Sequence, residues 1–336
     1  MIAKILIAAA GAVGVASMSP PLASGPAASG QAGSENLPVE WTLGPRSEGN
    51  ADTVQLSMSY RIGSGNSMNS GSQPLADLQG LTAAQLASPQ GGPVAFRIVR
   101  EAGRFDCRGI VRQWRGTGNC SFAPDAAFAA ALERRGIGRP SVRQQYQLTI
   151  DDVGLPLIQE LERHGYRKPD VDDLVAAGIH GVTIPYIRSM SGAGYRLGAV
   201  DELVKFRIHG VSSDYIREMG MLSPPGGRFS ADDLVGMRIH GLSADKVRNF
   251  GALGYRNLSR DDLMSMSIHG VTPDYIREMA ALGFKDLSAD ELVRMRIHGV
   301  TPDYVREMKA AGYTIPSADQ LVRMRISGFR PDRRRD

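Results

Sequence analysis

Apolar and polar positions after residue 122 follow one pattern that recurs with a fixed period. The copy at 288–313 reads S-A-D-E-L-V-R-M-R-I-H-G-V-T-P-D-Y-V-R-E-M-K-A-A-G-Y. Successive I-H-G triplets, with I-S-G in the last copy, lie 29, 31, 29, 29 and 29 residues apart. A fixed period in this range is typical of stacked repeats, whose units bury their apolar faces only against their neighbours. The pattern therefore predicts a solenoid-like helical array over residues 123–330.

Each copy is expected to form two short helices. The first begins at Ser288, where Glu291 three residues later completes a capping box, and its apolar positions run on to Ile297. Gly299 ends this helix, because glycine adopts the left-handed backbone conformation at little cost. Thr301 begins the second helix and is followed by proline, which is favoured at the first helical position. The unit is thus an αα-hairpin of 29 residues.

Residues 39–122 instead show the two-residue alternation that is typical of half-buried strands. Strands are expected over 39–43, 54–60 and 94–99 and in the hairpin 104–122. The stretch 64–74 is rich in Ser, Gly and Asn and is predicted to be a polar loop, and 75–87 is predicted to hold a short helix. The expected fold class is α+β, in which a small antiparallel β domain of four or five strands caps the array.

The N-terminus has the features of a secretory signal. Lys4 precedes the apolar run Ile5–Ala16, and small residues follow it, which predicts a signal peptide over residues 1–23. A flexible linker is expected over 24–38, and a basic tail over 331–336. We therefore expect a periplasmic or secreted protein with no membrane span after cleavage. The alternative is that the apolar run is retained as an anchor.

Composition narrows the picture only slightly. The chain has 336 residues, of which 42% are hydrophobic and 22% charged, as in ordinary globular proteins, and its net charge of +4 does not by itself favour nucleic acid. It has two cysteines, Cys107 and Cys120. If the hairpin turns at Gln113–Trp114, these cysteines face each other on paired strands, within reach of a disulfide. Export favours that disulfide over a redox or metal role.

Histidine recurs at one position of the repeat. The residues are His180, His209, His240, His269 and His298. A metal ladder or a proton relay would be the functional interpretation. However, stacked helices lie about 8–10 Å apart, whereas zinc needs ligands at roughly 2.0–2.1 Å, so one histidine per copy cannot converge on one ion. We therefore interpret the histidines as helix C-cap residues and predict no metal or cofactor, while a pH-responsive stack stays a hypothesis.

Arginine recurs on the apolar side of the first helix. The residues are Arg207, Arg238, Arg296 and Arg325. A guanidinium there needs a partner or must extend to water. Glutamates of the second helix are the candidate partners: Glu218, Glu278 and Glu307. We predict an Arg–Glu ladder that fixes the stacking register. The alternative is a row of guanidinium groups that binds an acidic ligand.

The turn within each copy, I-H-G-V-T-P, is similar to the turn of a helix-hairpin-helix module, which grips a phosphate with helix N-terminal amides. Here Thr301 replaces the second glycine, and Asp303 places a carboxylate where a phosphate would bind. Nucleic-acid binding is therefore the alternative function. No Ser/His/Asp set, phosphate-binding loop or pair of catalytic carboxylates stands out, so we predict no catalytic residues and no enzyme.

The residue pattern of the hairpin and of the repeats also resembles that of a known family. Gly103, Phe105 and Gly109 fit a hairpin of outline G-x-F-x-x-x-G, and the repeats D-E-L-V-R-M-R-I-H-G-V-T-P-D-Y-V-R-E-M follow it. Over about residues 94–330 the chain is similar to the extracytoplasmic C-terminal region of bacterial regulatory metallopeptidases of the beta-lactam-sensor type and to related secreted proteins. The zinc motif and the multi-pass membrane part of such peptidases are absent from this sequence, so the resemblance implies a sensing or interaction module rather than proteolysis.

These observations together predict a non-catalytic, extracytoplasmic scaffold built from helical repeats. Extended repeat surfaces usually bind proteins or peptides along one face, so a protein or peptide partner is expected and nucleic acid is not. The sequence does not indicate an oligomeric state.

Overall fold

The computed structural model describes residues 38–44, 52–62, 65–195, 197–223, 227–314 and 317–330. The chain divides into Met1–Glu35 and Asn36–Asp336, and every described residue belongs to the second unit. The predicted signal peptide (1–23), residues 24–37 of the predicted linker and the predicted basic tail (331–336) therefore lie outside the described residues. Within the described ranges, no helix is long and apolar enough to cross a membrane.

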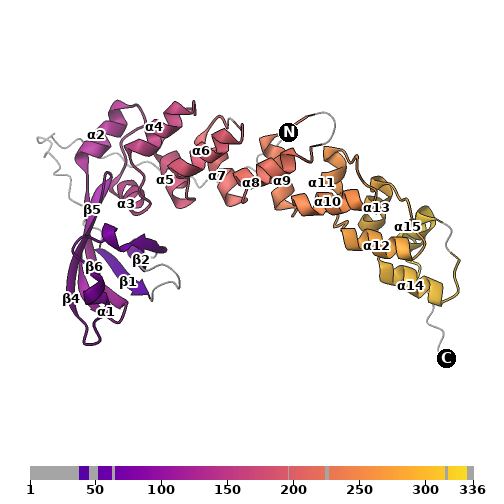
Figure 1. Cartoon of the computed structure of the whole chain (residues 1–336), viewed down its shortest axis with the longest axis horizontal. Coiled ribbons are helices and arrows are strands. Elements are labelled where there is room, and N and C mark those ends of the chain that lie inside the picture. The colour runs from indigo at the N-terminus through magenta and orange to yellow at the C-terminus, as the bar shows by residue number, and fades with distance from the viewer. Residues whose placement is uncertain are drawn as a thin grey trace, which may run out of the picture. The chain divides into compact units, whose positions relative to one another are not determined.

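The first part of the chain is a single antiparallel sheet, so the predicted α+β fold class is confirmed (Figure 1). Its strands are β1 (Pro38–Gly44), β2 (Thr53–Ile62), β3 (Gly65–Pro74), β4 (Gly92–Arg100), β5 (Gly103–Arg112) and β6 (Arg115–Pro124). Their order across the sheet is β3-β2-β1-β6-β5-β4. One face carries the apolar side chains and packs on the 3-10 helix η1 (Leu75–Asp77) and on α1 (Ala83–Ala87), where a short helix was predicted.

Strand β3 corrects the prediction of a polar loop over 64–74. It pairs with β2 along its full length, from Thr53 opposite Pro74 to Ile62 opposite Gly65. Because β3 lies at the edge of the sheet, backbone hydrogen bonds to one neighbour are enough to hold it, and its sequence shows no apolar alternation. Met68, its one large apolar residue, is 68% exposed.

The predicted hairpin is confirmed as β5 and β6. Gln113 and Trp114 form its turn with φ values of 48° and 61°, and Cys107 faces Cys120 and is joined to it by a disulfide. Trp41 of β1 is fully buried beside this hairpin, and its indole N–H donates to the Arg108 carbonyl at 3.2 Å.

Two glycines of the hairpin allow close approach of both the facing strand and the Trp41 ring. A Cβ atom at Gly109 would clash with the Thr117 carbonyl oxygen and lie 2.5 Å from the indole, and one at Gly118 would clash with the Arg108 carbonyl oxygen and lie 2.8 Å from the indole. Side chains at these two positions would therefore push the tryptophan out of the sheet core.

Among the described residues, fourteen helices follow the sheet, and they alternate between the two types that the repeat predicts. The first helices of the copies are α3 (Val142–Ile150), α5 (Val171–Ile179), α7 (Val200–Ile208), α9 (Ala231–Ile239), α11 (Arg260–Ile268), α13 (Ala289–Ile297) and α15 (Ala318–Ile326). The second helices are α2 (Ala126–Arg134), α4 (Leu155–Arg163), α6 (Ile184–Gly192), α8 (Ser213–Gly220), α10 (Ala244–Ala252), α12 (Pro273–Ala281) and α14 (Pro302–Ala310).

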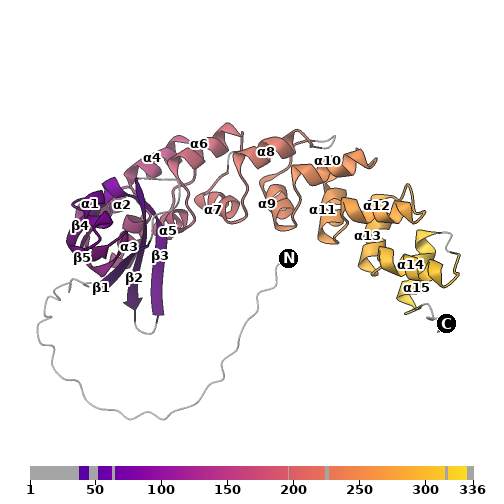
Figure 2. The same cartoon turned by 60° about the horizontal axis from the view of Figure 1, so that its bottom comes forward.

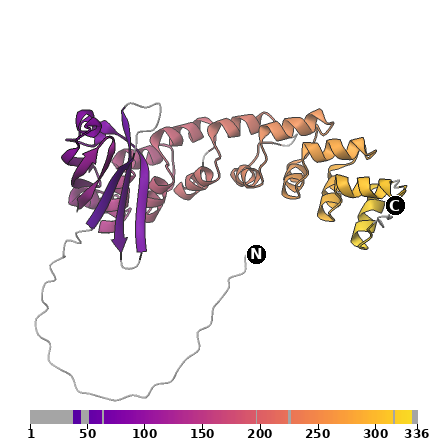
Figure 3. The same cartoon turned by 90° about the horizontal axis from the view of Figure 1, so that it is seen from below.

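Helices two apart in the sequence pack side by side, so the array has two layers (Figure 2, Figure 3). In the layer of first helices the closest neighbours are α3–α5–α7 and α9–α11–α13–α15, and in the other layer they are α4 through α14. Helix α2, a second helix, follows β6 directly, so the array begins on a half-repeat. Tyr146 of α3 takes part in the sheet core, with ring centroids 4.4 Å from Tyr60 and 5.2 Å from Phe105.

The helix ends follow the predicted chemistry. Capping boxes form at Asp170, Ser230, Ser259 and Ser288. Ala199 offers no side-chain cap, and the Glu202 carboxylate instead accepts from the Gly198 amide at 2.6 Å. Each first helix from α5 to α13 ends on its histidine as the C-cap residue, followed by a glycine with φ between 66° and 70°.

Candidate interaction surface

An arginine of one copy and a tyrosine of the preceding copy hold most repeat junctions together. The Arg296 guanidinium lies 5.1 Å from the centre of the Tyr275 ring, and its Nε donates to the His269 carbonyl at 3.4 Å. In return, the Tyr275 hydroxyl donates to the Val300 carbonyl at 3.0 Å. The same arrangement joins Arg207 to Tyr186, Arg238 to Tyr215 and Arg325 to Tyr304. Each tyrosine lies on a second helix, and each arginine lies near the end of the next first helix.

These contacts overturn the predicted pairing of the four arginines with glutamates. Each guanidinium extends back to the preceding turn, where an aromatic face and a backbone carbonyl receive it, whereas the glutamates lie on the outer side of the second helices. A ladder does exist there with other arginines: Arg306 pairs with Glu278, and Arg248 lies 3.9 Å from Glu218. Glu307 makes no ion pair with another described residue.

A further junction, between α10 and α11, has two polar side chains in place of this pair. Lys246 stands where the four junctions above have tyrosine, and Ser267 stands where they have arginine. The Lys246 ammonium donates to the Ser267 hydroxyl at 3.1 Å, and this hydroxyl donates to the His240 carbonyl at 2.7 Å. The His240 carbonyl therefore still accepts a hydrogen bond. The cation at this junction is Lys246 of the second helix instead of an arginine of the first helix, and burial lowers the pKa of Lys246.

The five recurring histidines occupy their predicted C-cap positions, and their side chains are at least partly exposed. Their backbone carbonyls accept from the next copy, as at His180 and His209. The imidazoles make no hydrogen bond with other described side chains, and among the described residues no group of His, Cys, Asp or Glu could hold a metal ion. The histidines are thus available at the surface, one per copy.

An isoleucine precedes each of these histidines, and its exposure at the surface was not predicted from the sequence. Isoleucine ends six consecutive first helices and is between 50% and 63% exposed in each: Ile179, Ile208, Ile239, Ile268, Ile297 and Ile326. We call these six residues the isoleucine row. The apolar character of Ile297 predicts a core position, and this prediction is wrong, because the side chain is 54% exposed. A helical wheel could have shown otherwise, because seven residues bring a helix to within about 20° of two full turns and so place Ile297 on the face of the exposed Asp290.

The outer face of the first helices therefore carries three parallel rows. The row at the N-terminal ends is aspartate in all six copies, and the helix dipole accounts for it: Asp172, Asp201, Asp232, Asp261, Asp290 and Asp319. The middle row varies: Ala176, Lys205, Gly236, Ser265, Arg294 and Arg323. The isoleucine row is uniform, but the packing of the chain itself does not explain it, because about half of each side chain faces solvent.

The sixth histidine belongs to a separate cluster between α4 and α6. His164 contacts the Ser191 hydroxyl at 3.0 Å with Nδ1 and the Glu160 carboxylate at 3.1 Å with Nε2. The carboxylate also accepts from Arg188 at 2.7 Å and from Arg163. These hydrogen bonds, that of Arg188 above all, lower the pKa of Glu160 to about 2. A carboxylate already shared by two arginines is a poor partner for a catalytic imidazole, and the cluster instead joins two second helices.

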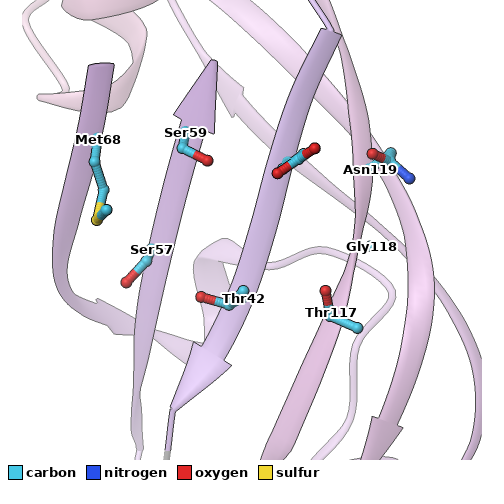
Figure 4. Close-up of a pocket in the computed structure, with 8 residues that line it drawn as sticks. Thr42, Ser57, Ser59, Met68, Thr117, Gly118 and Asn119 are labelled. Atoms are coloured by element: carbon cyan, nitrogen blue, oxygen red, sulfur yellow. The ribbon is translucent and has the colours of Figure 1, made fainter. Parts of the chain in front are cut away.

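A shallow hollow of about 480 Å³ lies on the solvent face of the sheet (Figure 4). Its lining is mostly short and polar: Glu40, Thr42, Ser57, Ser59, Met68, Thr117, Gly118 and Asn119. Glu40 is the only titratable group among the described residues that line it, so these residues offer hydrogen bonds but neither a nucleophile with a base nor a set of metal ligands.

The turns offer little to a phosphate. The Thr301 hydroxyl accepts from the Tyr304 amide at 3.1 Å, so this helix-end amide is already bonded. Asp303 stands at the same helix end and pairs with Arg306 at 2.5 Å. The helix-hairpin-helix alternative therefore gains no support from the geometry.

No protein-family model matches the chain, and no curated protein matches it either. The resemblance to the extracytoplasmic region of sensor-type metallopeptidases consequently stays an expectation from the sequence.

Proposed function

We propose that this protein is a non-catalytic extracytoplasmic scaffold and that a protein or peptide partner binds along its isoleucine row. The observation that carries the proposal is the exposure of the same large apolar residue, by 50% to 63%, at the same position of six successive copies. Scattered exposed apolar residues are normal, whereas an ordered group of them marks an interaction site.

The copies serve as controls for one another. Residues that face the core recur in each copy because they pack against neighbouring helices. The aspartates recur because a helix N-terminus favours a negative charge. The middle row has no such role and varies freely between charged, small and polar residues. An exposed isoleucine that does not vary therefore points to a requirement from outside the chain.

Export is a further part of the proposal. The disulfide between Cys107 and Cys120 supports it, because disulfides persist mainly in oxidising compartments. The N-terminal apolar run supports it from the sequence.

The test compares two sets of substitutions in the full chain. The on-row variant is I239S/I268S/I297S/I326S. The off-row variant M68S/I110S/M221S removes apolar residues that are as exposed, at 68%, 64% and 73%, but lie elsewhere. Wild type and both variants are immobilised, incubated with the exported protein fraction of the source cells and eluted in salt steps.

We expect a defined protein to be retained by wild type and by the off-row variant and to be lost from the on-row variant. Equal retention by all three proteins would exclude the isoleucine row as the binding surface. Recovery of nucleic acid alone, released at moderate salt, would favour the nucleic-acid alternative instead.

A further inference from the structure

We propose that the partner binds as a polyproline-II peptide with an apolar side chain at every third residue. This inference rests on the proposed function, and it concerns the segment of the isoleucine row on α9, α11, α13 and α15. These four helices are consecutive neighbours. The two extra residues of the repeat fall between Ile208 and Ile239, so Ile239, Ile268, Ile297 and Ile326 form the longest stretch of the row with an unbroken 29-residue spacing.

The pitch of the row is the first support. Packed helices lie about 8–10 Å apart, so neighbouring isoleucines of this segment recur at about that distance along the array. A polyproline-II helix has three residues per turn and rises 3.1 Å per residue, so every third side chain recurs at about 9.3 Å on one face. Four successive isoleucines thus match four side chains in about ten residues of peptide.

The width of the row is the second support. The row is one residue wide, because the neighbouring middle row carries Gly236, Ser265 and Arg294 and the histidines follow on the other side. An amphipathic α-helix presents a stripe more than about 100° wide and would press its flanking apolar residues against these polar groups. A polyproline-II helix repeats every third residue along one straight line, so it presents a stripe of matching width.

The histidines supply the third support. Each isoleucine of the segment except Ile326 is followed by an exposed histidine: His240, His269 and His298. A polyproline-II backbone makes no internal hydrogen bonds, so its carbonyls are free to accept from an imidazole. Each copy of the protein therefore offers one isoleucine and one histidine donor. Each turn of the peptide offers one apolar side chain and free backbone carbonyls, so the two match in number.

The test uses three fluorescently labelled 12-residue peptides and the full chain. The matched peptide is (Leu-Pro-Pro)4, in which leucine recurs at every third residue. The first control has the same composition with its four leucines adjacent, and the second is an amphipathic α-helical peptide with four leucines on one face. Anisotropy titrations are made with wild type and with the on-row and off-row variants.

We expect saturable binding of the matched peptide to wild type and to the off-row variant, and binding at least about tenfold weaker to the on-row variant, a change of ~1.4 kcal/mol spread over four side chains. Binding should depend little on salt, because the row is uncharged. Equal affinity for the adjacent-leucine peptide, or tighter binding of the helical peptide, would overturn the inference. So would the absence of binding by any peptide, while the pull-down with the same variants would decide separately whether the proposed function stands.

Discussion

The sheet and the helical array are stabilised by contacts of different kinds. In the sheet, Trp41 packs beside Gly109 and Gly118 and at 5.1 Å from the Phe96 ring, all from distant parts of the chain. In the array, the main contacts join residues about one copy apart, as Arg296 joins Tyr275. The sheet core therefore depends on residues such as Trp41 that occur once. In the array, the same kind of contact recurs at several junctions between copies.

This difference predicts where a substitution has the larger effect on the free energy of unfolding. Loss of a residue that organises the whole sheet core should destabilise all of it. Loss of one junction in an array should weaken one interface among several of the same design, because stability there is close to a sum of nearest-neighbour terms.

The largest expected effect is that of Trp41→Ala. Removing a fully buried tryptophan leaves a cavity and should cost about 3–5 kcal/mol of unfolding free energy in the sheet. Trp114, the other tryptophan of the chain, reports on the hairpin by fluorescence during urea unfolding. The neighbouring exposed Thr42→Ala serves as the control and should change the value by no more than about 0.5 kcal/mol. Similar midpoints for the two variants would contradict the role given to Trp41.

A smaller effect is expected for Arg296→Ala in the array. The variant loses a cation–π contact of about 0.5–1 kcal/mol and a hydrogen bond of about 0.5–1.5 kcal/mol, so ~1–2 kcal/mol in total. Far-UV circular dichroism in urea measures it. Arg294→Ala, on the same helix and in an exposed pair with Asp319, is the matched control and should cost less than about 1 kcal/mol. An equal cost for the two variants would show that the Tyr275 stack contributes nothing specific.

The exceptional junction allows the same contact to be built rather than removed. We expect the double variant K246Y/S267R to be more stable than wild type by about 1 kcal/mol, because it builds the tyrosine–arginine pair that is found at four other junctions. The single variant S267R should be less stable than the double variant, because it places a guanidinium beside Lys246. A double-mutant cycle measures the coupling. Additive effects of the two substitutions would mean that the pair does not act as a unit.

The features that local spacing encodes could be predicted from the sequence. The capping box at Ser288, the C-cap at His298 and the disulfide partner of Cys107 follow from local spacing, and each is found as predicted. Strand β3 could not be predicted in the same way, because it is held by backbone pairing and its side chains show no alternation.

The site was predicted less well than the fold. The partners of Arg296 were missed because both an aromatic ring and a carbonyl can receive a guanidinium, and only the stacking of two copies shows which groups it reaches. The exposure of Ile297 was within reach of the sequence, since the helical period places it on the solvent face. Its apolar character suggested burial. The recurrence of isoleucine at the same solvent-facing position in six copies could have indicated an exposed row instead.

The cluster around Glu160 should respond to acid. Its pKa of about 2 in the folded protein lies below the ordinary value of about 4.3 in the unfolded chain, so the stability it contributes is present above about pH 4.3 and is lost as the pH falls towards 2. We expect the difference in unfolding free energy between wild type and Glu160→Gln to shrink over that range. The effect should be modest, because the side chains of Arg163 and Arg188 are about 60% exposed and water screens them. A difference that is constant between pH 6 and pH 2 would contradict the assignment.

The smallest expected effect on stability is that of Ile297→Ser, and it separates binding from folding most sharply. Met295, two residues earlier on the same helix, is fully buried, and Met295→Ala should cost about 2–5 kcal/mol. Ile297 is 54% exposed, so its replacement should change the unfolding free energy by no more than about 0.5 kcal/mol. Thermal unfolding of both variants checks the contrast. If Ile297→Ser cost as much as Met295→Ala, the isoleucine row would be needed for folding, and its uniformity would no longer call for a partner.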